Sequence, residues 1–320
     1  MTLNPYAWVV NLRNYLYDKK LLPVCKPKVP VVSVGNLSVG GSGKTSVVRF
    51  LAESFSRHLH VVILSRGYRR KSKGTVVVSV RGDVKVSWEE AGDEAYMLAK
   101  VLPNTSVVVD EDRCRGAAIA VRELKADMLL LDDGFQHRRI HRDIDLLLLK
   151  REDVTDRVLP FGRLREPFDN YKRAHAVILA YQELGEWDLD LPAVRFNMVR
   201  ENWKVLSTSG EVIDPSGYEF VAFCGLGDNN QFFRTLDILG IKTKARLSFP
   251  DHHHYRDLHL LKDQLYITTL KDAVKFPPYP NLFYLDFSVR VEGLIEWISR
   301  KLNIIINLRA GSSAGRATDS

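Results

Sequence analysis

The sequence predicts an α/β protein, in which a mostly parallel β-sheet domain of the P-loop NTPase type is joined by a β-hairpin-like linker to a second, smaller α/β domain. Short apolar runs alternate with segments of helical periodicity. A glycine-rich loop also joins the first apolar run to the first helical segment. A chain of 320 residues is longer than one hydrophobic core usually takes, which favours two domains.

The expected elements follow from these patterns. The apolar runs read as strands buried on both faces, because their residues do not alternate with polar ones. The strands of the first domain are expected at 31–34, 61–65, 76–80, 106–110, 128–132, 145–149 and 176–180. The helices between them are expected at 44–55, 88–101 and 113–124. This order predicts a parallel sheet covered by helices on both faces.

The chain divides into five predicted parts. A basic amphipathic segment (1–23) precedes the nucleotide-binding domain (24–196), and residues 197–218, which are polar and contain Gly210, Pro215 and Gly217, form the linker. The smaller domain (219–305) and a disordered tail (306–320) follow. The elements expected in the smaller domain are strands at 220–224, 265–269 and 282–285 and helices at 231–239 and 291–302.

The composition is that of a folded globular protein, with 45% hydrophobic and 27% charged residues. The longest apolar runs, such as 128–131 and 146–149, are far shorter than the roughly 18 residues that a membrane span needs. The three cysteines, Cys25, Cys114 and Cys224, are odd in number and show no metal-binding or redox spacing. We therefore expect a reducing compartment and no disulfide bond.

Positive charge is concentrated in two stretches of the chain. The formal net charge is +7, and residues 1–30 carry a net +4 while residues 66–73 carry a net +5, so the remainder is about neutral. The two stretches indicate an anionic partner, although a run of charge can also be a solvated surface. Aromatic and aliphatic residues of the first stretch lie at helical spacing before Lys19 and Lys20. They fit a helix in a membrane interface or a helix packed on the domain.

The glycine-rich loop carries the clearest functional signal. A strand, the loop and a helix follow one another over residues 31–55, and Gly40, Gly41 and Gly43 allow successive amides to point at phosphate oxygens. Lys44 is expected to reach the β and γ phosphates, and Thr45 to bind Mg²⁺. The predicted nucleotide-binding residues are Ser38, Val39, Gly40, Gly41, Ser42, Gly43, Lys44 and Thr45. Ser38 occupies the position where the usual motif begins with glycine.

Two carboxylates end the apolar strand at 128–132. Asp132 and Asp133 lie at the edge of the sheet where ligands gather, and Asp132 fits the acid that holds Mg²⁺. Asp133 could instead cap the following turn. Gln136 and His137 come next and have no evident role in a core. These residues predict a metal and ligand site at this edge.

If the bound nucleotide donates phosphate in a kinase reaction, a further group must accept the proton of the acceptor hydroxyl. Asp93 and Glu94 lie where a loop enters a helix, so either can serve as this base or cap the helix. His252, His253 and His254 are consecutive and cannot all converge on one metal ion. A histidine that orients a catalytic carboxylate is the favoured interpretation.

Seven motifs together resemble the tetraacyldisaccharide 4′-kinase family over residues 10–300. They are the segments 35–45 (GNLSVGGSGKT), 64–68 (LSRGY), 91–94 (AGDE), 132–137 (DDGFQH), 164–167 (LREP), 249–252 (FPDH) and 271–275 (KDAVK), in the expected order. The resemblance implies transfer of phosphate from MgATP to the 4′-hydroxyl of an acylated glucosamine disaccharide 1-phosphate, the lipid A precursor. It also implies a peripheral location at the cytoplasmic face of the inner membrane, which favours the interfacial helix.

The resemblance also implies residue roles. Lys44 and Thr45 are the phosphate-loop lysine and the magnesium hydroxyl, and Asp93 is the catalytic base assisted by His252. The other residues fall around magnesium (Asp132, Asp133, Gln136), around the reacting centre (Arg113, His137, Glu166) and against the lipid headgroup (Arg66, Tyr68).

Two other functions are weighed against this one. A P-loop GTPase or metallochaperone is disfavoured because the guanine motif needs a spacer between lysine and aspartate, which the segment 269–272 (TLKD) lacks. A nucleic-acid-binding module is disfavoured because only Tyr68 offers a stacking aromatic within the basic run at 66–73. We expect no nucleic acid partner.

Overall fold

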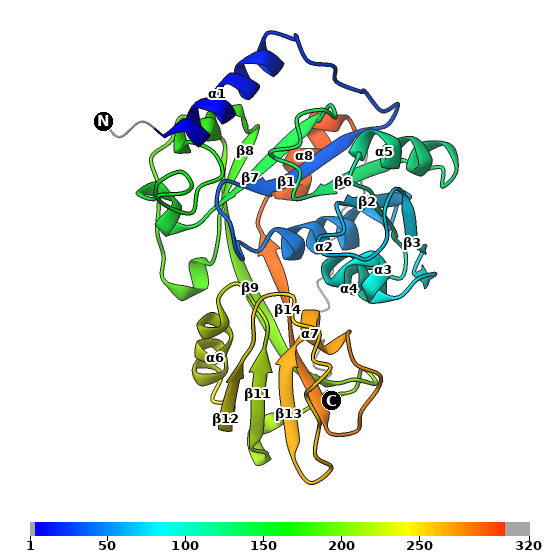
Figure 1. Ribbon diagram of the computed structural model, residues 1–320, viewed down its shortest axis with the longest axis vertical. Helices are drawn as coiled ribbons and strands as arrows, with labels where there is room; N and C mark the ends of the chain where they lie inside the picture. The colour runs from blue at the N-terminus through cyan, green and yellow to red at the C-terminus, as the bar shows by residue number, and fades with distance from the viewer. Residues whose placement is uncertain (1–3, 305–320) are drawn as a thin grey trace, which may run out of the picture.

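The structure, a computed structural model, describes residues 4–304, so the predicted tail and the first three residues lie outside it. One continuous path of paired strands runs through the whole molecule in the order β12-β11-β13-β14-β9-β8-β7-β1-β6-β2-β5-β3-β4. The strands form a larger part and a smaller part, which are stacked along the long axis in Figure 1. Strand β9 (Arg195–Ser207) belongs to both parts.

The larger part is a mostly parallel sheet, which confirms the predicted fold class. Strands β5, β2, β6, β1, β7 and β8 pair in parallel, and β3 and β4 are antiparallel additions at one edge. The central strands are buried on both faces because their residues are apolar on both faces. Their bounds are β1 (Val31–Asn36), β2 (Val61–Ser65), β3 (Val76–Val80), β4 (Asp83–Val84), β5 (Ser106–Val109), β6 (Met128–Asp132), β7 (Ile144–Leu149) and β8 (Ala176–Leu179).

Helices cover both faces of this sheet, as predicted. On one face, Val47 of helix α2 (Lys44–Phe55) and Leu98 of helix α4 (Asp93–Val101) share one buried cluster with the sheet. On the other face, helix α5 (Arg113–Arg122) packs through Ala117 and Ala120. The sheet therefore has a separate hydrophobic core on each side.

The helix predicted at 88–101 is broken at Gly92. Helix α3 (Trp88–Ala91) ends there, and α4 begins at the next residue. Gly92 has a φ of 85°, and a Cβ atom at this position would lie 3.0 Å from the carbonyl oxygen of Tyr68. A glycine is required for both reasons. The break places Asp93 on the first residue of α4.

The smaller part is the second α/β unit that the sequence predicts. Strand β11 pairs in parallel with β12 and β13, and β13 pairs in parallel with β14. Phe233 and Leu236 of helix α6 pack against Phe220 and Ile267 of the sheet. The elements are β11 (Phe220–Cys224), α6 (Asn229–Ile238), β12 (Thr243–Ser248), β13 (Leu265–Thr269), α7 (Leu270–Ala273) and β14 (Leu282–Val291).

The segment expected as a linker is part of the sheet. The first residues of β9 pair in parallel with β8, and the rest of β9 pairs antiparallel with β14. Strand β10 (Val212–Ile213) folds back on β9, so a hairpin is present. Short 3₁₀ turns lie at Arg151–Val154, Phe168–Arg173, Gln182–Leu184 and Pro215–Gly217.

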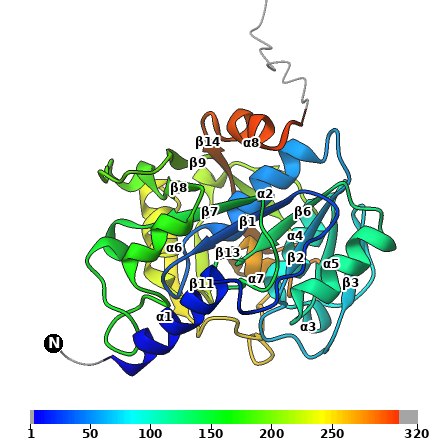
Figure 2. The same cartoon turned by 90° about the horizontal axis from the view of Figure 1, so that it is seen from above.

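The last described helix differs from its predicted location. Helix α8 (Leu294–Leu302) was expected in the smaller domain, but Leu294, Ile295 and Ile298 pack into the same cluster as α2 in the larger part. Strand β14 carries the chain back to the larger sheet, where the amphipathic helix finds an apolar surface. In Figure 2, α8 and α1 lie on opposite sides of the larger sheet.

Helix α1 (Pro5–Asp18) is attached to the larger part through polar groups. The side chain of Asn14, which is the only buried residue of this described helix, donates a hydrogen bond of 2.8 Å to Glu166. Arg138 donates to the carbonyl oxygen of Asn14 at 2.9 Å. The exposed large apolar side chains of this helix are Tyr6, Trp8, Val9, Leu12 and Tyr15, and Trp8 has 69% of its surface accessible. Within residues 4–304, no helix is long and apolar enough to cross a membrane.

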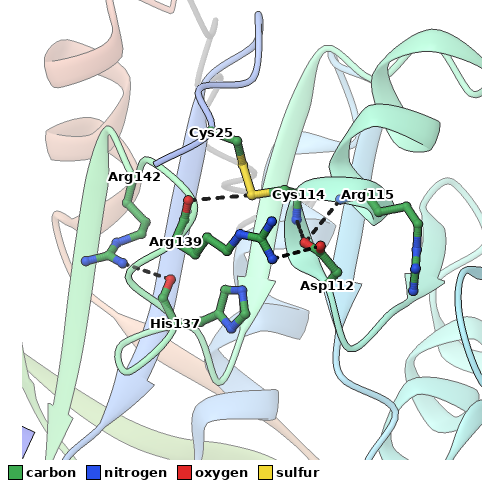
Figure 3. The surroundings of a disulfide bond; sticks show 7 residues. All are labelled: Cys25, Asp112, Cys114, Arg115, His137, Arg139 and Arg142. Atoms are coloured by element: carbon green, nitrogen blue, oxygen red, sulfur yellow. Dashed lines mark hydrogen bonds and ion pairs between the residues drawn. A yellow bond between two sulfur atoms is a disulfide. The ribbon is translucent and has the colours of Figure 1, made fainter. Parts of the chain in front are cut away.

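A disulfide joins Cys25 to Cys114, so the prediction of no disulfide bond was wrong (Figure 3). The two cysteines are 89 residues apart in sequence, which gave no spacing signal. The segment before β1 runs beside the turn after β6, because the amide of Cys25 donates to the carbonyl oxygen of Arg139 at 2.9 Å. This pairing brings Cys25 to the first turn of α5, where Cys114 lies. Cys224 is a buried free thiol.

We expect this disulfide to stabilise the larger part. A bridge that closes a loop of this length restricts the unfolded chain and typically contributes about 2–4 kcal/mol. Reduction should therefore lower the midpoint of thermal unfolding by several degrees. The Cys25→Ser/Cys114→Ser variant should unfold at the lower temperature with or without reductant. Equal midpoints for the oxidised and reduced wild-type chain would contradict the stabilising role.

Candidate active site

A cavity of about 640 Å³ lies between the two parts and is lined by residues from both. The larger part contributes the phosphate loop and the ends of β2 and β6, and the smaller part contributes the segments around residues 226–228 and 251–252. Residues predicted from sequence that line it are Ser38, Val39, Gly40, Gly41, Ser42, Gly43, Lys44, Thr45, Arg66, Tyr68, Asp132, Asp133 and His252. The structure thus brings most of the predicted site together.

The phosphate loop connects β1 to α2 at the centre of the larger sheet. Gly40 and Gly43 have φ values of 95° and 84°, in the left-handed region that favours glycine. Gly43 caps helix α2, and a Cβ atom on it would lie 2.9 Å from the Cε atom of Met198. The loop leaves the amides at the N-terminus of α2 open toward the cavity, an arrangement that binds phosphate.

Lys44 lies among oxygen atoms at the base of the loop. Its Nζ atom is 3.0 Å from Oδ1 of Asn36, 3.4 Å from Oγ of Ser42 and 3.6 Å from Oδ1 of Asp133. Sequence reasoning missed Asn36, the last residue of β1. These contacts fix the ammonium group beside the loop, where it can exchange a protein oxygen for a phosphate oxygen.

Asp132 and Thr45 form a donor set that fits Mg²⁺. Oγ1 of Thr45 lies 3.4 Å from Oδ2 of Asp132, and Oδ1 of Asp132 is buried without a hydrogen-bond partner. Burial, together with the carboxylates of Glu94 and Asp133, raises the pKa of Asp132 to about 7. A buried carboxylate with a free oxygen beside a hydroxyl suits a hard divalent cation, which would restore its charged form.

Asp133 is held by two cations. Both of its oxygens accept hydrogen bonds from the guanidinium of Arg165, at 2.9 and 2.8 Å. Burial alone would raise the pKa of Asp133, but Lys44 and Arg165 hold it well below its usual range. The segment that carries Arg165 is paired with the phosphate loop, because the amide of Arg165 donates to the carbonyl oxygen of Leu37 at 2.6 Å. Arg165 lies in the 164–167 motif, but the sequence predicted no role for it.

Gln136 does not line the cavity with Asp132. Its amide nitrogen donates to the carbonyl oxygen of Asn36 at 2.9 Å, and its Oε1 atom is buried without a partner. The carbonyl oxygen of Gln136 accepts from Arg13 of α1 at 2.8 Å. Gln136 therefore joins helix α1 to the strand that precedes the phosphate loop, rather than joining the acids in the cavity wall.

Asp93 and His252 meet across the two parts. Nδ1 of His252 lies 2.8 Å from both carboxylate oxygens of Asp93. Asp93 begins α4 of the larger part, and His252 follows β12 of the smaller part. His252 has a φ of 61° and its ring lies 5.0 Å from that of Tyr68. A non-glycine residue in this conformation is strained, and such strain is common at functional sites.

Two lysines that sequence reasoning left without a role surround Asp93. Nζ of Lys275 lies 3.2 Å and Nζ of Lys271 lies 3.9 Å from Oδ2 of Asp93. Burial would raise the pKa of Asp93, but the hydrogen bond from His252 and the two ammonium groups hold it well below its usual range. Asp93 is therefore ionised although it is buried. The spacing of the two lysines, four residues apart around α7, was the available signal.

The other two histidines of the run have different neighbours. The ring of His253 stacks on Phe249 at 4.7 Å between centroids, and the ring of His254 lies 4.9 Å from Trp88. Within residues 4–304, no group of three histidine, cysteine or acidic side chains is arranged to hold a metal ion. The run thus contributes one histidine to the cavity.

Three residues predicted around the reacting centre do not line the cavity. Arg113 is buried and donates to the carbonyl oxygen of Asp110 at 2.8 Å, and burial lowers its pKa to about 10. His137 is partly buried; burial and the charges of Arg113 and Arg13 lower its pKa to about 4. The positive charge of Arg113 acts to lower the pKa of both Asp132 and Asp133. Arg113 therefore influences the carboxylates of the cavity without lining it.

Glu166 lies beneath helix α1. It accepts hydrogen bonds from Arg173 at 2.6 Å and from Asn14 and Asn170 at 2.8 Å. These three donors account for a buried carboxylate whose pKa lies below its usual value, because the bonds outweigh the effect of burial. The structure places Glu166 at the attachment of α1 rather than at the reacting centre.

An aromatic wall lines the cavity beside β9 and β14. The guanidinium carbon of Arg200 lies 4.8, 5.0 and 5.6 Å from the ring centroids of Tyr181, Trp203 and Phe287. The Nη2 atom of Arg200 is buried without a partner. Sequence reasoning missed these residues because most belong to the two strands that join the parts, which no local motif marks.

Comparison with known proteins identifies the family of this chain. The family model described as tetraacyldisaccharide-1-P 4′-kinase matches residues 4–303. The chain belongs to this family. The tetraacyldisaccharide 4′-kinase of Aquifex aeolicus is 50% identical over 290 residues, which cover 90% of this chain and 92% of the relative. That of Halothermothrix orenii is 31% identical and covers 91% of this chain and 88% of the relative.

A solved relative of the kinase also shares the fold. The crystal structure of the "apo" form of LpxK from Aquifex aeolicus in complex with ATP superposes with a TM-score of 0.86 at 48% identity. It covers 93% of this chain, and this chain covers 96% of it. Membership of the kinase family excludes the GTPase and metallochaperone alternative.

We predict that Asp132→Asn weakens magnesium binding. The amide removes the charge that would attract the cation, so the Mg²⁺ concentration for half-maximal turnover should rise at least about tenfold. Asp127→Asn, just before β6 at the opposite end of the strand, is the matched control and should leave this concentration unchanged. An unaltered Mg²⁺ dependence in Asp132→Asn would place the metal elsewhere. The measurement is initial rate against free Mg²⁺ at saturating ATP.

Proposed function

We propose that this chain transfers the γ-phosphate of MgATP to the 4′-hydroxyl of a tetraacyldisaccharide 1-phosphate at a membrane surface. One observation carries the proposal: the phosphate loop of the larger part and His252, the partner of Asp93 in the smaller part, line one cavity of about 640 Å³. A kinase needs a phosphate cradle and a proton acceptor that share one space. The acceptor is inferred from the relatives, which are tetraacyldisaccharide 4′-kinases.

The phosphate side of the cavity would stabilise charge. The amides at the N-terminus of α2 cradle the β and γ phosphates, and Lys44 neutralises the charge that grows on the transferred group. Thr45 and Asp132 would hold Mg²⁺, which would supply positive charge against the phosphates. Arg165 orients Asp133 through two hydrogen bonds and keeps that carboxylate ionised. These groups position the phosphates without forming a covalent bond to them.

The opposite side would take the proton. His252 is the member of the Asp93–His252 pair that lines the cavity, and its Nδ1 is occupied by Asp93. The 4′-hydroxyl approaches the pair, which accepts its proton as a unit while the oxygen attacks the γ-phosphorus. The bond from the γ-phosphorus to the bridging oxygen breaks, and that oxygen leaves with ADP. Asp93 fixes the ring orientation and stabilises the protonated form, as a buried carboxylate does for a catalytic histidine. Asp93 and His252 are thus proposed as catalytic residues together.

The lipid would reach this cavity from the side of helix α1. Arg66 and Tyr68 line the cavity and are exposed, so they can meet the anionic headgroup. The exposed face of α1 carries Trp8, Val9 and Leu12, and Lys19 follows the helix. Such a face lies in the interface of an anionic bilayer, with its polar side attached to the protein. We place the enzyme at the cytoplasmic face of the inner membrane, peripherally bound.

The function is tested by supplying labelled ATP with and without an acylated glucosamine disaccharide 1-phosphate. Label should appear on the lipid at the 4′ position, and ATP turnover should depend on the acceptor. ATP turnover at the same rate with and without the lipid, or label at another hydroxyl, would contradict the proposal.

We predict that Asp93→Ala and His252→Ala each lower kcat by about 10²- to 10⁴-fold, the range typical of acid–base catalysis. The double variant should be little slower than the slower single variant, because residues that act as a unit are not additive. ATP affinity should change little in all three variants. The measurement is kcat at saturating lipid together with an ATP binding titration.

Two results would revise this assignment. Multiplicative losses in the double variant would show that Asp93 and His252 act independently. A large loss of ATP affinity in Asp93→Ala would make Asp93 a nucleotide or magnesium ligand instead.

We predict that Trp8→Ser with Leu12→Ser reduces binding to anionic phospholipid vesicles. The two side chains supply apolar surface that the bilayer would bury, and no packed core is disturbed because both are exposed. ATP affinity should not change. Ile238→Ser, on the exposed side of α6, removes a comparable apolar side chain that is 63% exposed and is the matched control. Wild-type vesicle binding in the α1 variant would contradict the docking role.

A further inference from the structure

The smaller part holds a buried ammonium group against Asp93. We propose that Lys275 is a positioning residue that fixes Asp93 from the smaller part and keeps the Asp93–His252 pair ready to accept a proton. This inference rests on the proposed role of that pair. It adds a residue that acts only through Asp93, since Lys275 does not line the cavity.

The contacts of Lys275 account for all three of its hydrogen-bond donors. Its Nζ atom lies 3.2 Å from Oδ2 of Asp93, 3.0 Å from Oδ1 of Asp272 and 3.1 Å from the carbonyl oxygen of His253. Its side chain is only 1% exposed. A saturated ammonium group in a buried site is held in one geometry, because any displacement leaves a donor unpaired.

Asp272 anchors this ammonium group to the smaller sheet. It is fully buried, and its other oxygen accepts hydrogen bonds from the amide of Gly225 and the hydroxyl of Thr269, both at 2.9 Å. Gly225 follows β11, and Thr269 ends β13. Lys275 is therefore fixed to the ends of two strands, and through it Asp93 is fixed to the same place.

Among the charged groups around Asp93, Lys275 has fewer competing acidic partners than Lys271. His252, Lys271 and Lys275 face its carboxylate, and its own helix adds the amide of Glu94 at 2.9 Å. Lys271 is shared among three acids: it lies 2.8 Å from Asp251, 3.8 Å from Glu94 and 3.9 Å from Asp93. Lys275 has only Asp93 and Asp272 as acidic partners, and the ring of Tyr255 lies 5.3 Å from its ammonium group.

The charge of Lys275 sets the sign of the expected effect. A cation 3.2 Å from Asp93 opposes protonation of the pair, so the pair stays in its accepting form to lower pH. Removing the cation makes protonation easier. The acidic limb of the rate profile must then move to higher pH, whichever member of the pair carries the proton. Removing the charge of Asp272 must move the limb the opposite way.

The experiment measures kcat/KM for the lipid against pH in Lys275→Met, Lys275→Arg and Asp272→Asn. The acidic limb should move up by about one to two pH units in Lys275→Met. It should return toward the wild-type position in Lys275→Arg, which restores the charge. In Asp272→Asn it should move to lower pH. KM for ATP should stay within about twofold in all three variants, because neither Lys275 nor Asp272 lines the cavity.

Leu236→Ala is the matched control for lost stability in the same part. Leu236 is fully buried in the core under α6, so its truncation destabilises the fold without changing a charge. It should lower the thermal midpoint and leave the acidic limb in place. Asp272→Asn supplies an independent readout should Lys275→Met fail to fold.

The outcomes distinguish a failure of the Lys275 role from a failure of the proposed function. An unmoved limb in Lys275→Met, or a shift in the same direction in Lys275→Met and Asp272→Asn, overturns the positioning role. If instead the wild-type chain shows no lipid-dependent turnover, the proposed function fails before Lys275 is examined. A wild-type enzyme with a profile that shifts as described supports both.

Discussion

The site depends on one pairing of strands, that of β9 with β14. Strand β9 carries the chain out of the larger sheet, and β14 carries it back, so the two parts are joined by adjacent hydrogen-bonded strands rather than by a loose connection. This pairing holds the ends of the smaller sheet opposite the phosphate loop. The cavity, with Lys44 on one side and His252 on the other, exists because these strands fix the distance between the parts.

Charge is arranged differently on the two sides of this cavity. On the phosphate side, Asp132 is buried with an unpartnered oxygen and a pKa raised to about 7, a state that a divalent cation would relieve. Asp93 is also buried but is paired with His252 and Lys275, which keep its pKa low. The two buried aspartates therefore differ in what stabilises their charged form. Asp132 would be stabilised by a cation from solution, whereas Asp93 is stabilised by cationic side chains of the protein.

Helix α1 contacts the segment that carries Arg165 and Glu166 through hydrogen bonds. Tyr6 donates to the carbonyl oxygen of Arg165, whose guanidinium binds Asp133, and Asn14 donates to the neighbouring Glu166. The helix thus touches the segment that pairs with the phosphate loop, while its aromatic face stays exposed. Arg165 therefore connects helix α1 to Asp133 beside the phosphate loop.

Local patterns in the sequence determined most of the fold and the phosphate side of the site. Strands β1, β2 and β6 and the loop before α2 follow from apolar runs, glycines and Lys44–Thr45, because these signals arise between residues close together in the chain. The tertiary structure alone decided what joins distant segments. The disulfide of Cys25 with Cys114, the return of α8 to the larger sheet and the contact of Lys275 with Asp93 depend on strand order and register, which no local pattern records.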